Sequence, residues 1–134
     1  MFRRILIRIS VLTVRVACNL AQPQPTLLPT PNIPTVEIID PPNNVQVIDG
    51  TEIVIDVVGR DASIGVSKIE LLVDGSNVNN VSPFDNVAAP VFRAQISWVA
   101  VGEGFHILEA VAYRPDGQRS DSALINVEVL PESP

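Results

Sequence analysis

Short runs of alternating apolar and polar residues, each closed by turn-forming residues, fill the chain from Pro34 to Leu130. The clearest run spans residues 91–99, where four apolar side chains alternate with arginine, glutamine and serine. A period of two is typical of β-strands, because successive side chains of a strand point to opposite faces of the sheet. No helical period appears along this stretch, so the sequence predicts an all-β domain.

We expect strands at residues 35–39, with a short second part at 45–48, and at 52–58, 67–73, 76–81, 91–99, 105–113 and 123–130. Their inward faces are expected to carry Ile53, Ile55, Val57, Ile69, Leu71, Val73, Phe92, Ala94, Ile96, Trp98, Leu108, Ala110, Ala112, Ile125, Val127 and Val129. Asp74-Gly75 predicts a tight hairpin turn, because glycine readily adopts positive φ. About seven short strands at this spacing predict an all-antiparallel β-sandwich of two sheets. A barrel of five or six strands is the alternative architecture.

Side chains that serve catalysis or metal binding are scarce: the 134 residues include one His and one Cys. Zinc, copper and haem sites draw on several such ligands, so His106 is expected to be a surface or rim side chain. Serines that a Ser-His-Asp triad could use exist at Ser63, Ser67, Ser97 and Ser120, but no Gly-x-Ser-x-Gly pattern occurs. We therefore expect neither an enzyme nor a resident cofactor.

Acidic residues in loops provide weak calcium candidates at Asp61, Asp116 and Asp121. Calcium needs several oxygen ligands in one place, and the sequence has no EF-hand spacing. Aspartate is also an ordinary turn residue, so these three side chains are expected mainly to form turns. No metal site is predicted.

The acidic residues in strands, Asp56, Glu70 and Glu109, are expected on outward faces as solvated carboxylates. A glycosidase would instead need two such groups facing each other across a cleft. Trp98 and Tyr113 are the candidates for a sugar-stacking platform. However, Trp98 shares its face with apolar neighbours and is expected in the core, and a single exposed aromatic residue makes a poor carbohydrate site.

The first 21 residues resemble an export signal. They begin with Arg3-Arg4, continue through an apolar stretch and reach Ala17-Cys18. A basic start, an apolar stretch and a small residue before the cut are typical of a signal peptide. Ala17-Cys18 also resembles the end of a bacterial lipobox, which makes Cys18 the expected lipidation site. Arg8 and Arg15 interrupt the apolar stretch, so a signal without lipid attachment and a segment that is no signal are the alternatives.

A proline-rich stretch follows this segment: residues 22–34 contain five prolines. Such a stretch favours the extended polyproline conformation, which spans roughly 40 Å over thirteen residues. We expect a signal-like segment at residues 1–21, a linker at 22–33 and the folded domain at 34–131. A lipid on Cys18 would make the linker a stalk.

Charge is distributed unevenly along the chain. Four of the nine basic residues lie within the first fifteen positions, and all fifteen acidic residues come later. An acidic domain repels nucleic-acid phosphates and anionic lipids. We therefore expect no nucleic-acid partner, and contact with a membrane through the lipid anchor only.

Four stretches carry a family pattern: PTVEIIDPPNN at residues 34–44, VSKIELLVDG at 66–75, ISW at 96–98, and GFHILEAVAY at 104–113 with Asp116-Gly117 after it. In order and spacing they resemble the bacterial immunoglobulin-like domains of secreted and surface-anchored proteins. The resemblance covers residues 33–131 and implies an immunoglobulin-like β-sandwich that serves as a spacer or adhesive module. Arg114-Pro115 departs from the pattern, because members commonly have Asp directly after the Ala-Tyr pair.

Together these features predict a non-catalytic extracytoplasmic module at the cell surface that serves as a spacer, adhesion or protein-interaction domain. The expected partner is an envelope or extracellular protein. The alternative is a carbohydrate-binding accessory module of a surface or secreted protein, with a polysaccharide as its ligand.

Overall fold

The computed structural model describes residue 28 and residues 32–133. Within these residues the chain forms eight strands and one short 3₁₀ turn, η1 (Phe84–Asn86). The strands are β1 (Thr35–Asp40), β2 (Val45–Ile48), β3 (Glu52–Arg60), β4 (Lys68–Val73), β5 (Ser76–Val81), β6 (Val91–Val99), β7 (Gly104–Tyr113) and β8 (Ala123–Leu130). The predicted strands are thus present, with ends that differ by at most two residues.

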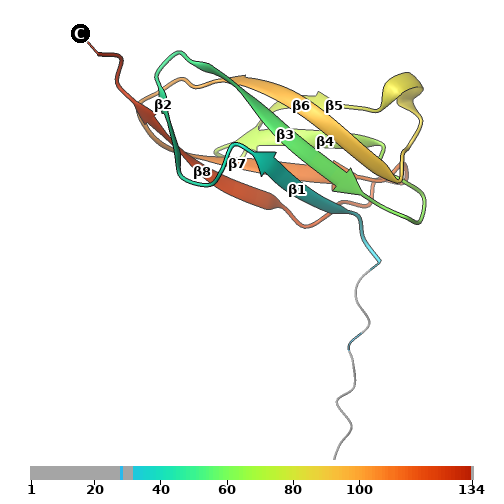
Figure 1. Ribbon diagram of the computed structural model, residues 1–134. Helices are drawn as coiled ribbons and strands as arrows, with labels where there is room; N and C mark the ends of the chain where they lie inside the picture. The colour runs from blue at the N-terminus through green and yellow to red at the C-terminus, as the bar shows by residue number, and fades with distance from the viewer. Residues whose placement is uncertain (1–27, 29–31, 134) are drawn as a thin grey trace, which may run out of the picture. The chain divides into compact units, whose positions relative to one another are not determined.

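The strands form two sheets that face each other (Figure 1). One sheet has three strands in the order β1-β3-β6, and the other has five in the order β2-β8-β7-β4-β5. The two sheets make the structure a β-sandwich, as predicted, and the alternative of a closed barrel is wrong. The strand order leaves β1 and β6 as the edges of the first sheet, and β2 and β5 as the edges of the second.

Aliphatic side chains from both sheets fill the space between them. The buried core consists of Ile55, Val57, Val66, Ile69, Leu71, Ala94, Ile96, Leu108, Ala110, Ala112, Ile125 and Val127, with Ile53, Val73, Phe92 and Trp98 packed partly buried against it. Burial of one such large side chain contributes about 1.5–3 kcal/mol to stability. The predicted inward faces are confirmed, because the period of two places alternate residues of each strand on the same side of the sheet.

The turn between β4 and β5 has the predicted two-residue form. Val73 pairs with Ser76 across it. Asp74 and Gly75 both have positive φ, 50° and 81°. Two successive residues with positive φ are typical of the type I′ turn, whose twist matches that of the flanking strands.

One pair of strands departs from the prediction that all neighbours are antiparallel. β2 runs parallel to β8, with Val45 opposite Val127 and Ile48 opposite Leu130. Between β1 and β2 lie Pro41 and Pro42, which have no N–H to donate to a ladder. The chain therefore leaves the first sheet at this point, and β2 joins the edge of the second sheet alongside β8.

Candidate functional site

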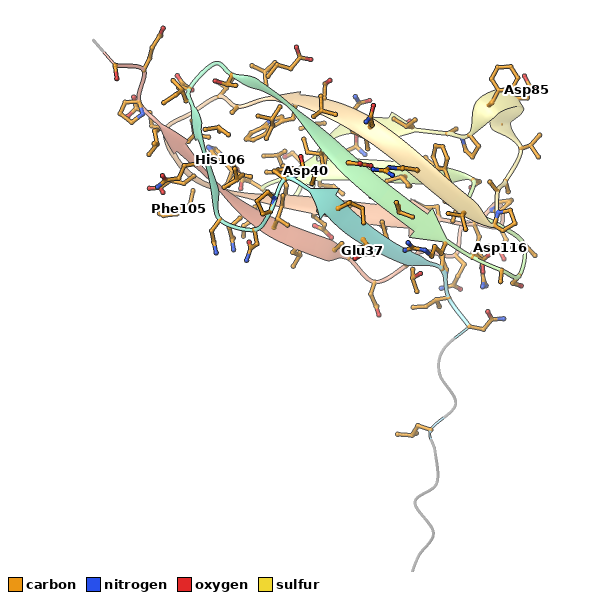
Figure 2. All side chains as sticks on the ribbon, viewed as in Figure 1. Glu37, Asp40, Asp85, Phe105, His106 and Asp116 are labelled. Carbon is orange, nitrogen blue, oxygen red and sulfur yellow. The ribbon has the colours of Figure 1, made fainter. Side chains whose placement is uncertain are left out.

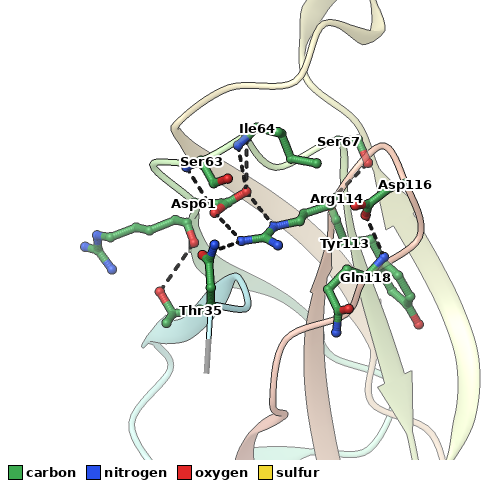
Figure 3. Close-up of polar contacts among 12 residues, drawn as sticks. Thr35, Asp61, Ser63, Ile64, Ser67, Tyr113, Arg114, Asp116 and Gln118 are labelled. Atoms are coloured by element: carbon green, nitrogen blue, oxygen red, sulfur yellow. Dashed lines mark hydrogen bonds and ion pairs between the residues drawn. The ribbon is translucent and has the colours of Figure 1, made fainter. Parts of the chain in front are cut away.

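At one end of the sandwich a buried ion pair joins the loop after β3 to the loop after β7 (Figure 3). Arg114 donates from Nε to Asp61 Oδ2 at 2.8 Å and from Nη2 to Asp61 Oδ1 at 2.9 Å. Three backbone N–H groups, of Ser63, Ile64 and Gly65, donate to the same carboxylate. The Arg114 guanidinium, aided by the backbone N–H groups of Ser63 and Ile64, lowers the pKa of Asp61 to about 2. Asp61 is therefore ionised at neutral pH, and both of its oxygens are bonded.

The same guanidinium also holds the chain just before β1. Arg114 Nη2 donates to Asn32 Oδ1 at 2.9 Å. Pro34, two residues further along, is fully buried. The ion pair therefore connects three separate parts of the chain, and we call Asn32, Asp61 and Arg114 the entry clamp.

The calcium candidates do not form a cluster of ligands. Arg114 lies close to both Asp61 and Asp116, and its pKa is raised first by Asp61 and to a smaller extent by Asp116. Asp116 accepts a hydrogen bond from the backbone N–H of Gln118 at 2.9 Å, as in an ordinary turn. Asp121 is exposed. Residues 28 and 32–133 contain no group of three or more His, Cys, Asp or Glu side chains that could hold a metal ion.

His106 lies near the opposite end of the sandwich from Asp116 (Figure 2). Its Nδ1 is 2.7 Å from Asp74 Oδ2, and its Nε2 is 2.6 Å from the carbonyl oxygen of Gly102. Since both neighbours are acceptors, the charged imidazolium, which carries two N–H groups, satisfies both contacts. The Gly102 carbonyl and the Asp74 carboxylate raise the pKa of His106 above its usual 6.5. His106 thereby connects the turn after β4 with the turn after β6.

Trp98 packs against the core and touches His106 from β6. The two ring centroids are 5.8 Å apart in an edge-on arrangement. Tyr113 lies on the outer face of the other sheet, where Lys68 Nζ sits 4.5 Å from its ring centroid. The core position predicted for Trp98 is confirmed, and the two aromatic rings do not share a platform.

The strand carboxylates face outward as predicted, but they are bonded to neighbours rather than freely solvated. Asp56 is only 8% exposed, because Arg93 on the adjacent strand donates to it from Nε at 2.8 Å. This guanidinium lowers the pKa of Asp56. Lys68 Nζ donates to Glu70 at 2.6 Å, and Ser122 Oγ donates to Glu109. The prediction of solvated carboxylates is wrong, because it left out the cation or hydroxyl that lies beside each group.

Two of the four candidate serines, Ser67 and Ser120, are bonded within the fold. Ser67 Oγ donates to the carbonyl of Tyr113 at 3.1 Å, and Ser120 Oγ accepts from the N–H of Ala112 at 3.0 Å. The two partners of His106 are Asp74 and Gly102. Within the described part of the chain, therefore, no serine donates to His106 in the manner of a Ser-His-Asp triad.

The entry clamp could not be derived from sequence alone. Asp61 and Arg114 are 53 positions apart and come together because two loops reach the same end of the sandwich. One signal was present in the sequence: Arg114 is the residue that departs from the family pattern. A cation replacing an expected Asp indicates a different electrostatic partner in that loop.

Two further observations concern export. Cys18, the signal-like segment and most of the predicted linker lie outside the described residues. Among the residues that the structure does describe, no helix has the length and apolar character needed to cross a membrane.

The fold and its aliphatic core define the class: an immunoglobulin-like β-sandwich. Residues 34–110 match the family described as Bacterial Ig domain, and the chain belongs to this family. No curated protein matches the chain.

Solved structures share the fold. The fibronectin(III)-like modules of Clostridium thermocellum CbhA are 24% identical, with 74% of this chain and 100% of that one covered and a TM-score of 0.62. The PKD domain of an M14-like peptidase from a Thermoplasmatales archaeon is 20% identical, covering 76% and 96%, with a TM-score of 0.52. A CARDB domain from Pyrococcus furiosus is 17% identical, covering 72% and 94%, also with a TM-score of 0.52. At these identities the likeness concerns the fold.

Proposed function

We propose that this chain is a non-catalytic extracytoplasmic module that spaces or presents a surface for contacts with envelope or extracellular proteins. One observation carries the proposal: the buried polar side chains of the described residues, Asp56, Asp61, Arg114 and Ser120, are each bonded to protein atoms. No buried side-chain nitrogen or oxygen there lacks a partner. Catalytic sites commonly keep a perturbed or unpaired polar group in a cleft for the reaction. A fully bonded interior supports a scaffold instead.

The likeness to other modules supports the same role. Bacterial Ig-like and fibronectin(III)-like modules are commonly extracellular and typically non-catalytic. A chain of this kind needs export, and the basic and apolar start of the sequence provides a signal for it. We further propose that Cys18 is lipidated and that residues 22–33 form the stalk between lipid and domain.

The test of the anchor compares wild type with Cys18→Ala in bacteria fed a labelled fatty acid. The wild type should incorporate the label and sediment with membranes, and the variant should do neither. Cys18→Ser, which is close in size but lacks the thiol, is a second test variant and should behave like Cys18→Ala. Equal labelling of all three chains would refute the anchor.

A carbohydrate-binding accessory module is the second candidate. Two exposed phenylalanines favour it: Phe84 is 90% exposed in η1, and Phe105 is 74% exposed on β7. Exposed aromatic rings can stack on the apolar faces of sugars. Affinity electrophoresis in gels that contain polysaccharide tests the idea: retardation of the wild type that Phe84→Ala or Phe105→Ala abolishes would support it. Unchanged mobility in every gel would leave the protein-contact role.

A further inference from the structure

The four edge strands of the sandwich differ in how well they are protected against pairing with another chain. Natural sheets protect their edges with short strands, bulges, prolines or charges. β2 has only four residues, β1 has an irregular register before Pro41, and the pairing of β5 with β4 is shifted between Leu71 and Leu72. Of these features β6 has only one, the charge of Arg93: the strand has no proline and pairs with β3 over nine consecutive residues without a shift.

The backbone of β6 offers a regular set of free donors and acceptors. Pro90 and Ala100, on either side of the strand, bond through their backbone to Asp61 and Thr51, on the β3 side. The backbone N–H and C=O groups of successive residues point to opposite sides of a strand. Those of the even-numbered residues of β6 therefore point toward β3. The odd-numbered residues, Val91, Arg93, Gln95, Ser97 and Val99, therefore direct their N–H and C=O groups to the free edge. Figure 1 shows β6 at the border of its sheet, on the side of β3 opposite β1.

The only charge on β6 is turned away from this edge. Arg93 donates from Nε to both oxygens of Asp56, at 2.8 Å and 3.1 Å. Asp56 lies on the neighbouring strand β3. The ion pair neutralises the guanidinium and holds it over the sheet. No acidic residue lies on β6, so the edge is locally neutral although the chain carries a net charge of −6.

The order of side chains on β6 is nearly the same in both directions around Gln95. Antiparallel pairing with a second β6 about this residue places Val91 opposite Val99. It places Arg93 opposite Ser97, and Gln95 opposite its own copy. All five pairs then join edge-facing residues, and each copy donates five backbone hydrogen bonds, which matches the roughly ten bonds of a typical protein interface. No like charges lie opposite one another.

The exposed side chains of β6 gain neighbours in the same arrangement. Val91 and Val99, 60% and 47% exposed, would form a cross-strand pair on the outer face. Phe92 and Trp98, both half-buried, would lie opposite each other on the inner face. Aromatic and β-branched pairs are those that stabilise neighbouring strands. A strand from another protein would need this pattern by coincidence, whereas a second copy of this chain carries it.

We propose that two copies of this chain pair through β6, antiparallel and centred on Gln95, to make one continuous six-stranded sheet. This pairing names a second copy of the chain as one partner. It does not depend on the proposed function. A strictly monomeric chain would overturn the pairing, and the fatty-acid labelling and the proposed scaffold role would be unaffected.

Sedimentation of the full chain between about 5 μM and about 500 μM provides the first test. The wild type should shift from monomer to dimer over this range. Gln95→Pro removes the N–H at the centre of the pair and should raise the dissociation constant roughly 30-fold or more. Gln95→Ala keeps that N–H and should stay within a few-fold of wild type. A wild type that is monomeric throughout, or Gln95→Pro pairing as tightly as Gln95→Ala, would overturn the proposal.

Register is tested by thiol cross-linking, which also covers the case that Gln95→Pro fails to fold. With Cys18→Ser as background, Gln95→Cys places two thiols on directly opposed residues, with Cα atoms about 5.5 Å apart. Ser97→Cys is the matched control, because its two copies would lie about 14 Å apart along the strands. A short bis-maleimide should link the first variant and not the second. Equal linking of both, or of neither, contradicts pairing centred on Gln95.

Discussion

At the scale of single residues, the polar side chains of this protein act by holding loops together at the two ends of the sandwich. The entry clamp joins three parts of the chain at one end through Asp61 and Arg114. His106 joins two turns at the other end through Asp74 and Gly102. Each of these groups is bonded within the protein. Their measurable effects should therefore appear in stability.

Asp61→Ala should lower the free energy of unfolding by about 3 kcal/mol, because it leaves the Arg114 guanidinium buried without a counter-charge. Urea denaturation followed by Trp98 fluorescence measures the change. Glu37→Ala is the matched control: Glu37 also pairs with an arginine, Arg60 at 3.3 Å, but both side chains are at least half exposed. That substitution should cost less than about 1 kcal/mol. Equal losses for the two variants would contradict the role of the entry clamp.

The pH dependence of stability should contain a contribution from His106. The pKa of His106 is raised in the folded protein, by the Gly102 carbonyl and then by Asp74. A raised pKa stabilises the fold fully at pH values below the unfolded pKa of 6.5, and this contribution is lost as the pH rises through the folded pKa. Tm should therefore fall by a few degrees between about pH 5.5 and about pH 9.

His106→Gln should remove most of this fall in Tm. The His106 pKa itself can be read by NMR without ambiguity, since the chain has a single histidine. Asp74→Asn keeps the shape of the turn but removes the carboxylate charge, so the measured pKa should move down toward 6.5. A Tm that falls equally in wild type and His106→Gln would show that other groups cause the pH dependence.

At the scale of strands and turns, the sequence was most informative where the chemistry is local. The period of two along β6 and β7 predicted which residues face the core, because side-chain direction in a strand depends only on position. The β4–β5 turn followed from Asp74-Gly75 for the same reason. The parallel pairing of β2 with β8 was missed, because it depends on which sheet the chain enters after Pro42. Nothing in the four residues of β2 specifies that choice.

Gly75→Ala tests the turn on which the β4–β5 hairpin depends. Gly75 has φ of 81° and no atom within 4 Å of where a Cβ would stand, so any loss of stability comes from the backbone alone. Alanine in this left-handed conformation should cost about 1–2 kcal/mol in urea unfolding. Gly75→Asn should cost less, because asparagine tolerates positive φ. A stable Gly75→Ala variant would contradict the type I′ geometry.

At the scale of the whole molecule, the protein is a sandwich whose cohesion comes from aliphatic burial between two sheets. Composition and strand spacing predicted this class, because hydrophobic alternation determines which faces must be covered. The entry clamp and the Asp56–Arg93 pair were not predicted, because each joins residues that the folded topology brings together from distant positions. The sequence predicted that Asp56 lies on an outward face and Asp61 in a loop. It did not predict that each carboxylate pairs with an arginine.

In the part of the chain that the structure describes, buried polar side chains find their partners within the protein, so stability should not depend on a bound ligand. The most direct test is the thermal unfolding midpoint of the full chain in excess calcium and in EDTA. With both oxygens of Asp61 bonded to Arg114 and to backbone N–H groups, the two midpoints should coincide. A midpoint several degrees higher in calcium, lost on Asp61→Asn or Asp116→Asn, would contradict the account.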